Sequence, residues 1–162
     1  MNSNLRILLI IGSINIYSND LISSFNNLIL NDLEFVQQTN INSRIDESVG
    51  KIYRKNNFIQ VEILKPSKEK YIIKDSLIEV HDFDFNQISY IDINDQDSHI
   101  LSLLKNGIDT NNVKKISTNT FVIDSINNSF EVEFKSEDEF ILSYKDNMNF
   151  RNTINFKSIN KQ

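Results

Sequence analysis

Three extended segments separated by turns follow one another in residues 65–91, which read KPSKEKYIIKDSLIEVHDFDFNQISYI. Pro66, the only proline in the chain, has no backbone N–H to donate to a sheet and therefore marks a turn or a strand edge. The segments after it are rich in β-branched and aromatic residues, and Asp, Asn and Ser stand between them. The predicted strands are residues 71–74, 76–81 and 87–91, with turns at 75–76 and 82–86. This order predicts a β-meander in which one face of each strand is apolar.

The composition limits the class of protein. A chain of 162 residues is expected to form one domain, and with 40% hydrophobic and 24% charged residues it can bury a core. Its 17 basic residues are outnumbered by 22 acidic ones, so we expect no nucleic-acid binding, because phosphate neutralisation dominates such affinity. No cysteine is present, which excludes disulfides, thiolate metal sites, cysteine nucleophiles and the acylated N-terminal cysteine of a lipoprotein.

Residues 1–18, MNSNLRILLIIGSINIYS, predict a secretory signal peptide. Arg6 supplies a positive charge, and the apolar run that follows it is too short to span a bilayer comfortably. We expect cleavage after Ser18, which leaves a single domain over residues 19–162. The alternative is that the same residues form an N-terminal strand of the core.

Two segments have the pattern of an amphipathic helix. The first is residues 20–30, with Asp20 as the expected N-cap. Its apolar face consists of Leu21, Phe25, Leu28 and Ile29. The second begins after Ser98, which can cap it, and ends at Asn106-Gly107. Its apolar residues are Ile100, Leu101, Leu103 and Leu104.

The rest of the chain is dominated by alternation of apolar and polar residues, as in Ile59-Gln60-Val61-Glu62-Ile63. This alternation is typical of a sheet with one buried face. The further predicted strands lie within residues 33–41, 50–55, 57–64, 121–123, 130–135, 140–144 and 153–157, with a polar turn at 43–49 and a hairpin turn at 127–128. We therefore predict a mainly β fold with about eleven strands and two or three short helices.

The meander resembles a known family, the LolA-like periplasmic carriers of outer-membrane lipoproteins. That family has a Lys-Pro pair, an Asp-Gly turn and a Tyr-Asp-Pro-Asp-Leu-Glu-Gln-Val run in the same order and spacing. The similar residues here are Lys65-Pro66, Asp75-Ser76 and His81-Asp82-Phe83-Asp84-Phe85-Asn86-Gln87-Ile88. The first strand and the closing hairpin of the family are also similar to this chain, at Phe35-Val36-Gln37, Asp146-Asn147, Arg151, Thr153 and Ile154-Asn155-Phe156.

The resemblance implies an unclosed antiparallel β-barrel with a helical lid over a hydrophobic cavity. It also implies a periplasmic chaperone that binds the acyl chains of lipoproteins released from the inner membrane and carries them to an outer-membrane receptor. The implied partners are acylated lipoproteins, an inner-membrane ABC-type lipoprotein-release complex and an outer-membrane lipoprotein receptor, with the carrier itself a monomer. The alternative is an outer-membrane lipoprotein receptor-like protein or another lipid-binding protein of the same fold. Such receptors are anchored through an N-terminal cysteine, which this chain lacks.

The implied cavity is lined by apolar residues of the strands, and for each of them the alternative is an ordinary core position. These residues are Phe35, Ile59, Val61, Ile63, Ile78, Val80, Phe83, Phe85, Phe130, Val132 and Phe134. The implied lid is the helix with Ile100, Leu101, Leu103 and Leu104, and its alternative is a helix that only seals the core.

A basic residue after the second strand fastens the lid in the family. Either Arg54 or Lys55 stands at that place here. Lysine cannot reproduce the planar fork of arginine, which favours Arg54, whereas the spacing from Pro66 favours Lys55. The alternative is that both are solvated charges at a strand end.

An enzyme or a metal-binding protein is a further alternative. The two histidines, His81 and His99, stand among acidic residues. These acidic residues are Asp82, Asp84, Asp92, Asp95 and Asp97. However, no glycine occupies the position that a calcium loop requires, and Asp is expected in turns. No nucleophile motif, phosphate loop or zinc signature is present. We therefore expect no catalytic residues, no metal and no cofactor.

Overall fold

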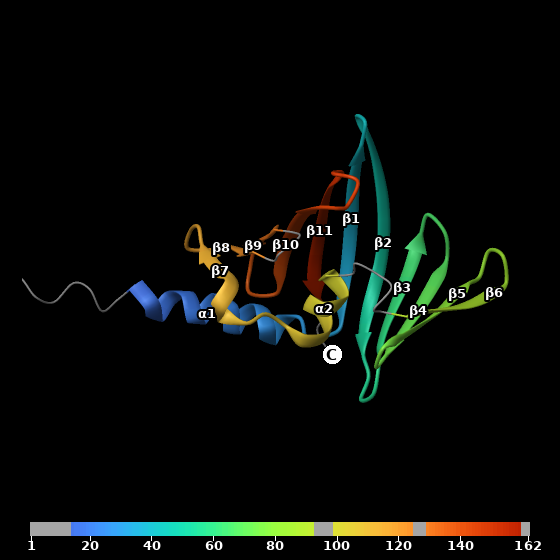
Figure 1. Ribbon diagram of the computed structural model, residues 1–162, viewed down its shortest axis with the longest axis horizontal. Coiled ribbons are helices and arrows are strands. Elements are labelled where there is room, and N and C mark those ends of the chain that lie inside the picture. The colour runs from blue at the N-terminus through green and yellow to red at the C-terminus, as the bar shows by residue number, and fades with distance from the viewer. Residues whose placement is uncertain (1–13, 93–98, 125–128, 160–162) are drawn as a thin grey trace, which may run out of the picture.

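The computed structural model describes residues 14–92, 99–124 and 129–159. Over these residues the chain forms one antiparallel sheet of eleven strands, in the order β6-β5-β4-β3-β2-β1-β11-β10-β9-β8-β7, with two α-helices beside it (Figure 1). β6 and β7 stand at the two edges, and within the described residues they do not pair, so the sheet is not closed. This confirms the predicted fold class of a mainly β protein with an unclosed antiparallel sheet.

The strands of the first half are β1 (Leu33–Ile41), β2 (Arg44–Arg54), β3 (Ile59–Lys65), β4 (Glu69–Lys74), β5 (Leu77–Asp82) and β6 (Gln87–Asp92). Those of the second half are β7 (Val113–Lys115), β8 (Thr120–Asp124), β9 (Ser129–Phe134), β10 (Glu139–Lys145) and β11 (Arg151–Ser158). The helices are α1 (Ile14–Leu28) and α2 (His99–Asn106), and the 3-10 helix η2 (Thr110–Asn112) precedes β7.

Two meanders meet in the middle of the sheet. Strands β1–β6 follow one another to one edge, strands β7–β11 return from the other edge, and β1 pairs with β11. In the centre Phe35 of β1 lies opposite Phe156 of β11 on one side and opposite Gly50 of β2 on the other. Residues that lie opposite each other in an antiparallel sheet share a face. The register therefore collects the apolar residues on the face that carries Phe35, which we call the inner face; the opposite one is the outer face.

Helix α1 packs on the inner face beside the β8–β11 half of the sheet (Figure 1). Phe25 meets the rings of Phe121 and Phe140 edge to face, with centroids 5.7 and 5.1 Å apart, and Phe140 stacks on Phe156 at 5.0 Å. All four rings are buried. Edge-to-face and offset contacts add to the free energy gained by burying aromatic area, so this half of the inner face is a solid core.

Helix α2 has the predicted bounds, whereas α1 begins earlier than predicted and ends at Leu28. Of the apolar residues predicted for α1, Phe25, Leu28 and Ile29 are buried and Leu21 is partly buried. The helix begins at Ile14, so Asp20 is not its N-cap. Helix α2 ends where predicted, because Gly107 adopts a left-handed φ of 71° and its N–H donates to the carbonyl of Leu103 at 2.9 Å. The predicted Ser98 cap, the turn at 127–128 and residues 1–13 of the predicted signal lie outside the described residues.

Residues 43–49 correct the sequence prediction of a polar turn. Residues 44–49 belong to β2, which pairs with β1 along the length of that hairpin. The turn is confined to Asn42 and Ser43, whose φ values of 49° and 72° are both left-handed, as a two-residue type I′ hairpin requires. The polar residues that suggested a loop are exposed or partly exposed, because this end of the hairpin projects beyond its neighbours (Figure 1). Strand β7, which carries two lysines in three residues, was not predicted.

Candidate functional site

The inner face carries rows of apolar side chains that run across the strands. One row passes from Ile52 through Val61 and Tyr71 to Val80. A second row contains Ile59, Ile73, Ile78 and Ile91. Most of the residues predicted to line a cavity therefore do lie on one continuous surface, on strands that are distant in the sequence.

The two halves of this surface differ in how fully they are covered. In the half beside α1, Phe35, Phe130 and Val132 are fully packed in the core. In the β3–β6 half, Ile59, Ile73 and Ile78 are buried as well. The remaining apolar and aromatic inner-face residues of that half are only partly buried, namely Val61, Ile63, Tyr71, Val80 and Ile91. The candidate binding surface is this partly covered group, which we call the β3–β6 face. Phe134, another predicted cavity residue, is also partly buried but belongs to the other half.

Phe83 and Phe85 are corrections to the predicted lining. They lie in the β5–β6 turn and are 56% and 75% exposed. The carboxylate of Asp82 accepts hydrogen bonds from the backbone N–H groups of Asp84 and Phe85, each at 3.0 Å, and so builds the turn. Strand alternation ends at this point, which is why an apolar residue here need not face the interior.

Helix α2 places its apolar residues against the same core. Leu104 is buried, and Ile100, Leu101 and Leu103 are partly buried. These are the four residues predicted for the lid. Their contacts with the core are those of any amphipathic helix.

Arg54, a predicted latch residue, holds the segment after α1. Its guanidinium donates to the carbonyl of Ile29, and its backbone N–H donates to Oδ1 of Asp32 at 2.7 Å. Burial lowers the pKa of Arg54, while the carboxylate of Asp32 acts in the opposite direction. Lys55, the other candidate, is exposed, and its Nζ lies 5.4 Å from the centre of the Tyr53 ring.

Helix α2 is fastened by residues that the sequence did not single out. Asn26 of α1 makes two hydrogen bonds with the backbone of Ile108, accepting from its N–H at 2.9 Å and donating to its carbonyl at 3.1 Å. At the same end of α2, Nζ of Lys105 donates to the carbonyl of Asp75 in the β4–β5 turn at 2.7 Å. No local pattern connects residues so far apart in the chain, so sequence periodicity could not find them.

A polar cluster lies at the other end of the inner face. Asn152 is buried, and its Oδ1 accepts from Oγ1 of Thr39 at 2.6 Å and from Nε2 of Gln37 at 3.2 Å. Its Nδ2 donates to Asp146 and to the carbonyl of Phe150, each at 3.2 Å. Both the oxygen and the nitrogen of the buried Asn152 amide have hydrogen-bond partners. The cluster therefore has the features of a structural network.

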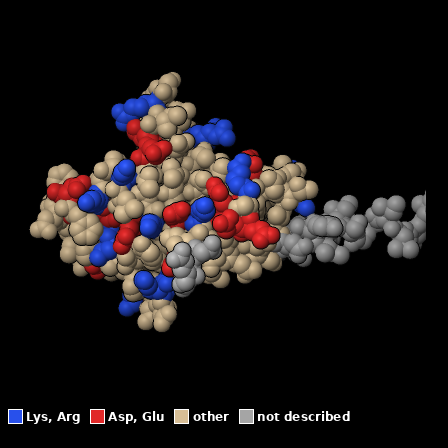
Figure 2. All heavy atoms as spheres, turned by 180° about the vertical axis from the view of Figure 1, so that it is seen from behind, with Lys and Arg blue, Asp and Glu red and all other residues tan. Residues whose placement is uncertain are grey.

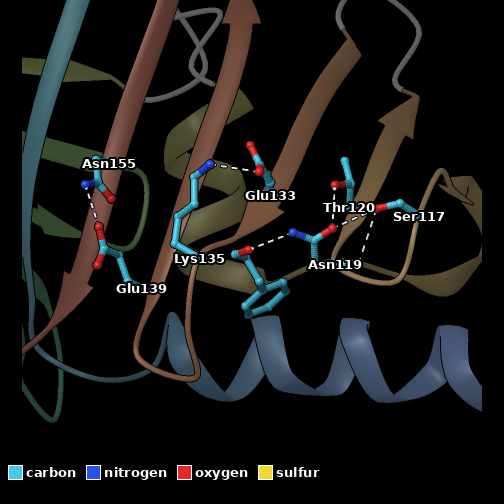
Figure 3. Close-up of polar contacts among 8 residues, drawn as sticks. Ser117, Asn119, Thr120, Glu133, Lys135, Glu139 and Asn155 are labelled. Atoms are coloured by element: carbon cyan, nitrogen blue, oxygen red, sulfur yellow. Dashed lines mark hydrogen bonds and ion pairs between the residues drawn. The ribbon is translucent and has the colours of Figure 1, made fainter.

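The outer face and its turns carry charged and polar pairs. Figure 2 shows basic and acidic side chains interspersed over the side of the molecule that it presents. In Figure 3 Asn155 donates to Glu139 at 2.8 Å, and Lys135 pairs with Glu133 at 2.8 Å. Asn119 donates to the backbone carbonyl of Phe134 at 3.0 Å and so ties the turn before β8 to β9. The Asn155–Glu139 and Asn119–Phe134 bonds join neighbouring strands, whereas the Lys135–Glu133 pair runs along the end of β9. These contacts form no catalytic arrangement.

A shallow depression of ≈ 500 Å³ lies at the β2–β3 turn, and the residues around it are mainly polar and basic. It is lined by Arg54, Lys55, Asn56, Asn57, Phe58 and Lys74. Among the described residues, no three His, Asp or Glu side chains gather as a metal site would require. Neither described helix has the length and hydropathy needed to cross a bilayer.

Comparison with known proteins identifies no family. No family model matches the sequence, and no curated protein matches it. Solved structures with a similar course of the chain include an uncharacterized conserved protein from Thermus thermophilus, which is 13% identical over 90% of this chain and 89% of that chain, with a TM-score of 0.49. A redesigned β-barrel is 12% identical over 85% of this chain and 96% of that chain, with a TM-score of 0.35. Neither likeness is close enough to carry a function across.

Proposed function

We propose that the protein is a periplasmic carrier that binds the acyl chains of lipoproteins on the β3–β6 face. The observation that supports this best is the uneven coverage of the inner face. One half is sealed by α1, whereas Val61, Ile63 and Val80 in the other half remain partly accessible. In this proposal α2 is the lid, and the space between it and the β3–β6 face receives the hydrocarbon.

The physical chemistry of the surface suits such a ligand. Each methylene that leaves water is worth about 0.8 kcal/mol, so an acyl chain can be held by apolar contact alone. A carrier must also release its cargo, which requires a weakly held lid. The polar bonds that hold the C-terminal end of α2 are those of Asn26 with Ile108 and of Lys105 with Asp75, and the latter is exposed to water.

The resemblance of the meander to the lipoprotein carriers supplies the rest of the proposal. The donor is an inner-membrane ABC-type lipoprotein-release complex, and the acceptor is an outer-membrane lipoprotein receptor. A related role, as a receptor-like or other lipid-binding protein, uses the same surface with a different partner. The identity of the bound lipid distinguishes the two, because a carrier holds acylated protein.

The test is to express the protein in the periplasm and identify by mass spectrometry what elutes with it. We expect acylated protein, and we expect the purified chain to take up an apolar dye that a synthetic acylated peptide displaces. A chain that takes up neither acyl chains nor dye would contradict the proposal.

A matched pair of variants locates the site. Val61→Asp puts a charge on the β3–β6 face and should weaken dye and acyl-peptide binding by on the order of tenfold or more, since a carboxylate is costly beside hydrocarbon. Val36→Asp makes the same change on the outer face, where Val36 is exposed, and should leave binding unchanged. Equal loss in both variants would mean that the ligand does not occupy the β3–β6 face.

A further inference from the structure

The two edges of the sheet are built differently. β7 is three residues long and carries Lys114 and Lys115, and short, charged edges resist pairing with other strands. β6 at the other edge has six residues, QISYID, with no lysine, arginine or proline. Within the described residues no strand pairs with its outer side. The features that usually protect an edge strand are therefore present at β7, whereas β6 has only the charge of Asp92 at its end.

The outward side chains of β6 are apolar. Ile88 and Tyr90 point to the outer face and are 58% and 62% exposed. Phe83 in the adjoining turn stacks on His81 with ring centroids 6.3 Å apart. Nζ of Lys70 lies 5.9 Å from the centre of the Phe83 ring. Because His81 and Lys70 lie on the outer face, Phe83, Ile88 and Tyr90 form one exposed apolar strip along the edge.

The backbone of β6 presents hydrogen-bonding groups to the same edge. The N–H of Phe83 donates to the carbonyl of Lys68 on the β4 side at 3.1 Å, so the groups of the preceding residue, Asp82, face β6. Asp82 lies opposite Gln87, and backbone direction alternates along a strand. Consequently Gln87, Ser89 and Ile91 bond to β5, whereas the N–H and C=O groups of Ile88 and Tyr90 point away from the sheet.

We propose that a second copy of this chain pairs with this edge, in an antiparallel β6–β6 ladder centred on Ser89. In that register Ile88 lies opposite Tyr90 of the partner subunit, and the two-fold axis creates a second, identical pair. Because the backbone groups of Ile88 and Tyr90 point outward, each of the two pairs exchanges two backbone hydrogen bonds. The residues from Gln87 to Ile91 are uncharged, so no like charges meet across the ladder. The apolar strips of the two copies become continuous. This arrangement replaces the monomer expected from the sequence and is independent of any bound lipid.

A register-specific disulfide tests the ladder, because the chain has no cysteine of its own. Ser89→Cys places two thiols on the two-fold axis, at a pair whose Cα atoms lie about 4.5 Å apart, within reach of a disulfide. Gln87→Cys is the matched control on the same strand, since both positions are exposed and the control thiols lie about 13 Å apart along the ladder. We expect mild oxidation to give a covalent dimer with Ser89→Cys and a monomer with Gln87→Cys.

Sedimentation of the unmodified chain gives the second test. We expect a dimer whose population rises with protein concentration and with added salt, because salt screens the repulsion between two chains of net charge −5. Ile88→Lys should weaken the dimer by on the order of tenfold. Ile116→Lys changes an equally exposed isoleucine next to β7 and should have no effect. A monomer at every concentration, or equal cross-linking at residues 87 and 89, would overturn the proposal, and so would cross-linking at residue 87 alone, because it would show a different register.

Discussion

Single residues on the inner face combine an apolar environment with a polar group. Tyr144 lies against Phe130, with ring centroids 5.5 Å apart, and its phenol is partly buried. Burial raises the pKa of Tyr144 to about 12 from the usual 10.0, and the carboxylate of Asp146 acts in the same direction. Burial also raises the pKa of Tyr71, together with its hydrogen bond to Glu69.

This gives a prediction for alkaline pH. A folded-state pKa above the unfolded value of 10.0 means that the fold favours the neutral phenol, so the contribution is complete below pH 10 and is lost as the pH rises through about 12. We expect the free energy of unfolding, measured by chemical denaturation, to fall over this range. The free energy of unfolding of Tyr144→Phe should fall less steeply with pH. Tyr71 should be responsible for part of the remaining slope. Identical slopes for the two proteins would show that Tyr144 does not contribute.

Gly50 illustrates what the sequence cannot reveal at the level of one residue. From the sequence it was the predicted start of a strand. In the structure it lies under the ring of Phe35, where an added Cβ would come within 2.5 Å of Cζ of that ring and 2.3 Å of the carbonyl oxygen of Glu62. The Phe35 ring and the Glu62 carbonyl leave no room for a Cβ, so glycine is required at this position. Both groups come close to Gly50 only through the register of β1, β2 and β3.

Among the elements, α2 is attached at its C-terminal end by hydrogen bonds to residues distant in the sequence. Asn26→Ala removes both hydrogen bonds to the backbone of Ile108 and leaves those groups without their partner. We expect this variant to lose about 1–3 kcal/mol of stability in chemical denaturation and to exchange the amide hydrogen of Ile108 faster.

The neighbouring Asn27→Ala is the control for this prediction. Asn27 is on the same helix and does not share these bonds, so its replacement should change neither the stability nor the exchange rate appreciably. If Asn26→Ala and Asn27→Ala behaved alike, α2 would be held by its apolar contacts and the two hydrogen bonds would contribute little.

Two element boundaries that local chemistry sets occur where the sequence predicted them, whereas the Asp20 N-cap does not. The Asp75-Ser76 turn and the stop of α2 at Gly107 depend on residues that favour a left-handed backbone, and both occur where predicted. The start of β2 depends instead on its pairing with β1, because nothing local makes residues 44–49 a strand. Pairing with the long strand β1 makes these residues a strand despite their polar composition.

The whole molecule is divided into a sealed half and a partly covered half, which predicts different responses to the same substitution. Val132→Thr puts a hydroxyl into a fully buried position and should lower the free energy of unfolding by about 1–3 kcal/mol. Val80→Thr makes the same change on the β3–β6 face, where the side chain is partly accessible, and should lower it by less than about 1 kcal/mol.

Chemical denaturation of the two variants measures this difference directly. Binding of an apolar dye provides the complementary measurement, since only Val80→Thr changes the proposed binding surface and only it should weaken binding. Equal loss of stability at both positions would mean that the two halves of the inner face are packed alike.

The sequence by itself determined the mainly β character, the number and order of nearly all strands, and which residues alternate toward one face. These are local properties, since periodicity and turn chemistry act over a few neighbouring residues. Only the tertiary structure decided that Phe130 and Val132 lie in a sealed core, that Val61 and Val80 stay partly accessible, and that Phe83 and Phe85 are exposed. Coverage depends on where two helices dock and on how distant strands pair. Such contacts join residues far apart in the chain, and no pattern in a short stretch of sequence contains that information.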